Sequence, residues 1–107
     1  MSETFEFWGD EQTIRDVTDF LREHGCRIRP EPLECANAKG KKAPDSICVT
    51  VCDTVVKLAR VWADLATEKK VEISFESDDT VLIGRPGDSP DRFESYLHKH
   101  KKIILKF

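Results

Sequence analysis

The sequence predicts one α+β domain in which helices pack on one face of a mostly antiparallel sheet. The chain has 107 residues, a length that suits one domain and is too short for two. Segments with alternating apolar residues are interleaved with segments in which apolar residues recur at helical spacing. Six Phe, two Trp and one Tyr supply enough apolar bulk for a folded core.

Residues 4–8 predict the first strand, because apolar and polar side chains alternate along them. Phe5 and Phe7 fall on one face and Trp8 falls on the other. If helices cover the two phenylalanines, Trp8 lies on the open face of the sheet. An uncovered tryptophan is typical of a protein interface. In the alternative, a C-terminal strand or the loop at 30–44 covers Trp8.

The next segment predicts a helix between Asp10 and Gly25. Asp10 can accept hydrogen bonds from the free amides of the first turn, and Gly25 is typical of the left-handed residue that ends a helix. The apolar positions recur at helical spacing and are Ile14, Val17, Phe20 and Leu21. They predict that one side of this helix is buried.

Residues 26–29 alternate and predict a second strand. Arg27 and Arg29 share one of its faces, which indicates that one side of the sheet is exposed there. The residues from 30 to 44 contain three prolines and are predicted to be a flexible surface loop. We take six residues as candidates for binding a partner: Trp8, Arg27, Arg29, Lys39, Lys41 and Lys42.

The second half of the chain predicts a strand, a helix and a hairpin. Residues 47–51 are a β-branched run typical of a buried strand, and residues 55–66 carry a wide apolar stripe typical of a helix. An alternative makes residues 46–67 one continuous helix. Residues 71–83 then predict a hairpin whose turn lies at 77–80.

A third helix is predicted to start at Ser89, with Pro90 at the position where a missing amide costs nothing. Residues 98–107 are predicted to be a basic tail, with a last strand over 103–107 as the alternative. The first six elements, β-α-β-β-α-β, match the ferredoxin-like pattern. We therefore expect residues 1–107 to form a single ferredoxin-like sandwich with an extra C-terminal helix and strand.

Charge and targeting signals exclude several classes of protein. The net charge is −3, and no aromatic residues are interleaved with the two lysine clusters at 39–42 and 99–106, which argues against nucleic-acid binding. No window approaches the ~20 apolar residues that span a bilayer. The acidic N-terminus lacks the basic and apolar regions of a signal peptide. We expect a cytoplasmic protein that does not bind a membrane.

The chain has four cysteines, none of them in a C-x-x-C pair. Cys26 and Cys48 are expected to be buried free thiols in strands. A zinc site would draw on the cysteines and on His24, His98 or His100, but the paired spacing of zinc-binding motifs is missing. No phosphate-binding loop, H-E-x-x-H motif or G-x-S-x-G motif is present. We expect no catalytic residues, no cofactor and no metal.

Four segments of the second half are similar to a known group of domains. They are residues 45–51 (DSICVTV), 58–59 (LA), 62–65 (WADL) and 71–75 (VEISF). With them the chain resembles the small effector-associated constant-component domains of bacterial conflict systems, over residues 4–97. The resemblance implies a non-enzymatic adaptor or regulator that works beside a defence effector such as a protease or an NTPase.

Three functional hypotheses follow. The leading one is a non-enzymatic protein-binding adaptor or regulator in a bacterial defence system, with an effector or defence component as its partner. The second is a small phage-encoded inhibitor, whose acidic surface blocks a host defence or nucleic-acid-binding complex by mimicry. The third is a small cysteine-based metal protein or enzyme. Each of the three hypotheses is compatible with a homodimer.

Overall fold

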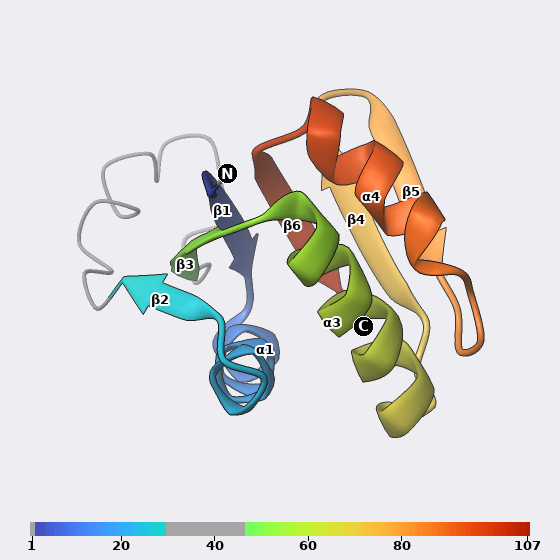
Figure 1. The fold of residues 1–107 in the computed structure, drawn as a ribbon, viewed down its shortest axis with the longest axis horizontal. Coiled ribbons are helices and arrows are strands. Elements are labelled where there is room, and N and C mark those ends of the chain that lie inside the picture. The colour runs from blue at the N-terminus through green and yellow to red at the C-terminus, as the bar shows by residue number, and fades with distance from the viewer. Residues whose placement is uncertain (1, 30–46) are drawn as a thin grey trace.

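The computed structural model describes residues 2–29 and 47–107. In these residues, three helices and six strands follow one another in the predicted order (Figure 1). The elements are β1 (Glu3–Gly9), α1 (Glu11–Glu23), β2 (Arg27–Arg29), β3 (Ile47–Asp53), α3 (Val55–Lys69), β4 (Ile73–Ser77), β5 (Thr80–Gly84), α4 (Pro90–Lys99) and β6 (Lys102–Lys106).

The helices begin where capping residues stand in the sequence. The side chains of Asp10, Thr54 and Ser89 each accept a hydrogen bond from an amide of the first helical turn, which satisfies one of the free donors at a helix start. Gly25 has a φ of 78° just after α1, as predicted. The chain from Ile47 is a strand followed by α3, so the alternative of one helix over residues 46–67 is wrong.

The six strands form one mixed sheet in the order β2-β3-β1-β6-β4-β5. β3 pairs antiparallel with both β1 and β2, and β4 pairs antiparallel with both β6 and β5. β6 runs parallel to β1 and joins the two halves. β2 and β5 are therefore the two end strands.

The predicted α+β class is confirmed, but the strand order differs from that of the ferredoxin-like fold. In that fold the fourth strand pairs with the first, because it closes the second β-α-β unit. Here β6 takes the place beside β1 and moves β4 one position outward. Ile103 and Leu105 of β6 are 0% and 1% exposed, so residues 98–107 are not a tail. They end α4 and then supply a central strand.

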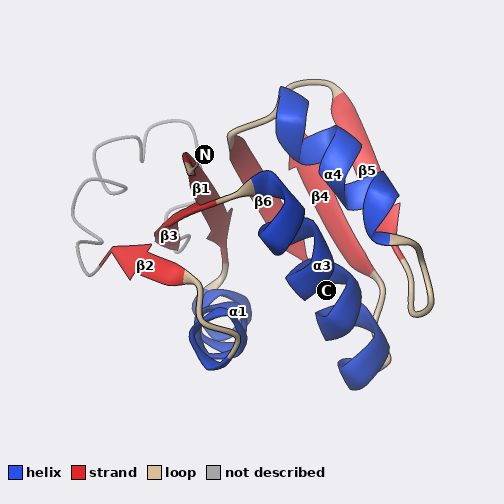
Figure 2. Ribbon diagram, in the orientation of Figure 1, coloured by secondary structure: helices blue, strands red, loops and turns tan. Residues whose placement is uncertain are grey.

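The helices lie on one face of the sheet (Figure 2), and the main core fills the space between them. Its centre is a row of aromatic rings: Trp62 of α3 makes edge contacts with Phe7 and Phe75, with ring centroids 5.1 Å apart in both cases. Phe75 in turn contacts Phe93 of α4. Each buried ring contributes about 1.5–3 kcal/mol relative to exposure. In the described residues, no helix is long and apolar enough to cross a membrane.

Candidate protein-binding surface

The strand register determines which residues share the face of the sheet that carries no helix. Arg27 pairs with Cys52 and Arg29 with Thr50, and Thr50 pairs with Glu6 of β1. Residues opposite each other in a ladder point to the same face. The helix-free face therefore carries Arg27, Arg29, Cys48, Thr50, Cys52, Thr4, Glu6, Trp8, Lys102, Ile104, Lys106, Ser74, Glu76, Val81 and Ile83.

Trp8 lies on this face as predicted, yet its side chain is only 2% exposed. It packs with Cys48 and the half-buried Ile104 in a second, smaller apolar cluster. Its indole Nε1 donates a hydrogen bond to Glu6 Oε1 at 3.3 Å. Of the two alternatives for Trp8, the uncovered one is therefore wrong, and Trp8 cannot be a contact residue of a partner that docks on the surface as it stands.

The cysteines also differ from expectation. Cys48 is disulfide-bonded, so the prediction of a free thiol at this position is wrong. Cys26 and Cys52 are free. Burial raises the pKa of the Cys26 thiol, and the nearby Asp53 carboxylate adds to the rise, which keeps this thiol neutral and unreactive. Disulfides persist mainly in oxidising compartments, so the cytoplasmic location stays a prediction.

Charged residues of β1, β4 and β6 lie around the Trp8 cluster on the helix-free face. Glu76 of β4 forms an ion pair with Lys106 of β6 at 3.2 Å, and Glu6 lies opposite Lys102 in the ladder. Such alternating charges are typical of a solvated sheet face. They offer a partner neither a large apolar patch nor an unbalanced charge.

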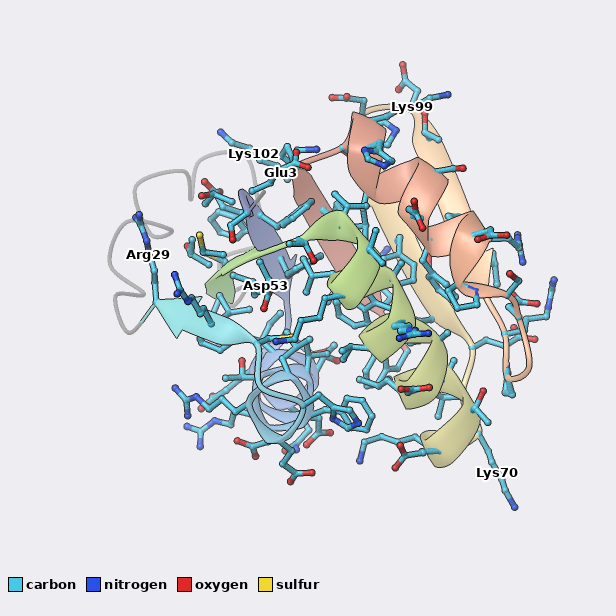
Figure 3. The ribbon with its side chains drawn as sticks, in the orientation of Figure 1. Glu3, Arg29, Asp53, Lys70, Lys99 and Lys102 are labelled. Atoms are coloured by element: carbon cyan, nitrogen blue, oxygen red, sulfur yellow. The ribbon has the colours of Figure 1, made fainter. Side chains whose placement is uncertain are left out.

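The strongest candidate surface is the end strand β2, which we call the arginine edge and define as Arg27, Ile28 and Arg29. Both arginines are exposed, and Arg29 extends away from α1 (Figure 3). Neither makes an ion pair or a side-chain hydrogen bond within the part of the chain that is described. Ile28 is half-buried and packs on the core. The edge thus carries two exposed positive charges that have no ionic partner among the described residues.

A groove of about 370 Å³ adjoins the arginine edge, between α1 and the start of β3. Ile28 and Ile47 are among its apolar lining residues, and the charged residues that line it are Arg15, Arg22, Arg29 and Asp19, so basic side chains outnumber the one acidic side chain. Ile47 is 38% exposed. Sequence reasoning missed Arg22 and Ile47, because only the packing of α1 beside β3 brings them to the strand.

The remaining candidates add no described residue to this surface. Lys39, Lys41 and Lys42, with the predicted loop at 30–44, lie outside the described residues. His98 and His100 approach different carboxylates, Glu94 and Asp78, at 3.9 Å. Within residues 2–29 and 47–107, no three His, Cys, Asp or Glu side chains come together as a metal site.

Comparisons with known proteins give this surface no precedent. No family model, no curated protein and no solved structure matches the chain.

Proposed function

We propose that this protein is a non-enzymatic protein-binding module, and that its arginine edge binds an acidic, extended segment of a partner protein. The observation that carries the proposal is the pair of exposed arginines on an end strand, neither of which has an ionic partner among the described residues. Guanidinium groups left without carboxylates are suited to bidentate pairing with carboxylates from another molecule.

The spacing of the two arginines favours an extended ligand. Arg27 and Arg29 are two residues apart in a strand, so their Cα atoms are separated by roughly 7 Å. A second strand laid against β2 presents alternate side chains at the same spacing. A segment with Asp or Glu at alternate positions could therefore pair with both arginines, while an apolar side chain beside them enters the groove at Ile28 and Ile47.

The bacterial defence context of this proposal rests on the resemblance of residues 4–97 to conflict-system domains. In that context the acidic segment belongs to an effector or to another defence component. The arginine edge would serve a phage-encoded inhibitor equally well. It indicates that the partner is acidic, but it does not indicate whether this protein comes from a bacterium or from a phage. The neighbouring genes separate the two: an effector gene supports the adaptor, and phage structural genes support the inhibitor.

A peptide-binding experiment tests the proposal. The probe is a fluorescein-labelled peptide of eight residues with Asp or Glu at alternate positions, and the readout is fluorescence anisotropy. Arg27→Glu/Arg29→Glu should weaken binding at least tenfold, about 1.4 kcal/mol. The matched control, Arg60→Glu/Lys69→Glu, makes the same change of charge at exposed positions of α3 and should leave binding within twofold.

Salt provides a second readout. Binding by exposed charges should weaken as ionic strength rises, because the Debye length falls to about 3 Å at 1 M salt. Absence of binding by the wild-type chain at low salt, or equal loss in both double variants, would contradict the proposal.

A further inference from the structure

The opposite end of the sheet has a different character. β5 (Thr80–Gly84) is the other end strand, and its sequence, TVLIG, contains no charged residue. Val81 is 57% exposed, and Ile83 beside it is half-buried. Natural end strands are usually protected by charge, proline, a bulge or shortness. β5 has five residues and none of these protections.

The hairpin geometry determines which backbone groups β5 presents outward. Ser77 and Thr80 flank the turn, and the pair that flanks a two-residue turn is a hydrogen-bonded one. Bonded and non-bonded pairs alternate along an antiparallel ladder. Val81 and Ile83 therefore direct their N–H and C=O groups away from β4, toward the open edge.

We propose that a second copy of this chain pairs with β5, antiparallel and across a two-fold axis, with Leu82 opposite Leu82 of the second copy. This register sets Val81 opposite Ile83 of the second copy, and each of these residues supplies an outward N–H and C=O. Four backbone hydrogen bonds then form across the axis. The two apolar side chains meet on the helix-free face, where Val81 is now largely exposed.

Charge complementarity supports the same register. One position beyond each end of β5 stand Asp79 and Arg85, both exposed. With Leu82 on the axis, Asp79 lies opposite Arg85 of the second copy, so opposite charges meet twice. Arg85 already pairs with Glu72 at 3.2 Å, which holds its guanidinium near the end of the strand. Asp79 makes no ion pair within the described residues.

The dimer would join two six-stranded sheets into one. Both arginine edges would then lie at the far ends of the joined sheet, away from the dimer contact at β5. This inference uses none of the residues of the arginine edge, so it stands or fails separately from the proposed function. If both hold, the dimer is a bivalent binder, and its avidity for a partner with two acidic segments exceeds that of one site.

The oligomeric state of the full chain tests the proposal. Light scattering after size-exclusion chromatography, at roughly 10 µM to 1 mM protein to cover a weak interface, should show a concentration-dependent dimer. Val81→Lys should weaken dimerisation at least tenfold, because two lysines enter the interface. The control Val56→Lys alters an equally exposed valine on α3 (58%) and should dimerise as the wild type does. A monomer at every concentration, or a dimer that survives Val81→Lys, overturns the proposal.

A charge swap and a cross-link test the register. Asp79→Arg or Arg85→Asp alone should weaken the dimer, and the double variant should restore it. In a Cys52→Ser background, Leu82→Cys should form an interchain disulfide, since opposite Cα atoms of a non-bonded pair are about 4.5 Å apart. Val81→Cys should not, because diagonal neighbours are about 7–8 Å apart. Cross-linking through Val81→Cys in place of Leu82→Cys would contradict this register.

Discussion

The two end strands of the sheet differ in length and in charge. β2 has three residues, two of them arginines, whereas β5 has five residues and no charge. Two copies of β2 placed side by side would bring like charges together, which opposes self-pairing. Two copies of β5 would bring Val81 against Ile83 and Asp79 against Arg85. The comparison teaches that like charges on β2 oppose pairing with its own copy and suit the acidic segment that we propose as its partner, whereas β5 is compatible with its own copy.

The largest effect is expected on the β2 side of the sheet, at the disulfide-bonded Cys48 of β3. Cys48→Ser should lower the free energy of unfolding by about 2–4 kcal/mol, because the disulfide restricts the unfolded chain. Urea unfolding with and without a reductant measures this. Thiol titration of the unfolded chain should find fewer reactive thiols before reduction than the four found after it. Four reactive thiols before reduction would contradict the account.

The second effect concerns the attachment of β5 to the core. A side chain at Gly84 would overlap the ring of Phe93 from α4, so Gly84→Ala should cost about 1–3 kcal/mol through overpacking. The matched control, Thr80→Ala, alters the exposed opposite end of the same strand and should stay within about 0.5 kcal/mol. Thermal unfolding compares the two. Equal stability of the two variants would show that β5 is not held against α4 as described.

The third effect concerns the phenol group of Tyr96, which links α4 to the β4–β5 hairpin through hydrogen bonds. Tyr96 Oη lies 3.0 Å from the carbonyl oxygens of both Phe75 and Thr80, so Tyr96→Phe should cost about 1 kcal/mol. Burial raises the pKa of Tyr96, and the carboxylates of Asp78 and Glu76 add to the rise. The folded state therefore favours the neutral phenol.

The pH dependence of that effect follows from the sign of the shift. The contribution of the phenol is complete below the pKa of an unfolded tyrosine, about 10, and is lost as the pH rises through the higher pKa of the folded state. The stability difference between wild type and Tyr96→Phe should accordingly narrow above pH ~10. A difference that widens there would contradict the assigned shift.

The smallest effect is expected at the arginine edge. Arg27→Ala/Arg29→Ala should change the free energy of unfolding by less than about 0.5 kcal/mol, because neither side chain has an ionic partner in the described part of the chain. Acidic-peptide binding should nevertheless be lost. If the free energy of unfolding falls by well above about 1 kcal/mol in chemical unfolding, the arginines stabilise the fold, which would contradict a role in partner binding alone.

Local features of the fold could be predicted from the sequence because neighbouring residues cause them. The N-caps at Asp10 and Ser89, the turn between β4 and β5, and the buried stripe of α3 all follow from short-range spacing. The placement of Arg27 and Arg29 on one face follows from strand alternation. These are the local features that the sequence predicted correctly, whereas the role of the two arginines in binding stays a prediction.

Features that depend on distant segments could not be predicted in this way. β6 lies between β1 and β4, and nothing in the residues from 102 to 106 specifies those neighbours. The same holds for Trp8, whose alternation places it on the helix-free face but does not show that the face is covered there. The disulfide at Cys48 is a third case, because cysteine spacing alone does not identify a bonded pair.

Residue-resolved amide hydrogen exchange tests the difference between the two edges most directly. Raising the protein concentration should slow exchange at Val81 and Ile83 and leave Arg27 to Arg29 unchanged. Adding the acidic peptide should slow exchange in β2 and leave β5 unchanged. Protection of β2 by concentration alone, or no protection of β5 at any concentration, would contradict the account.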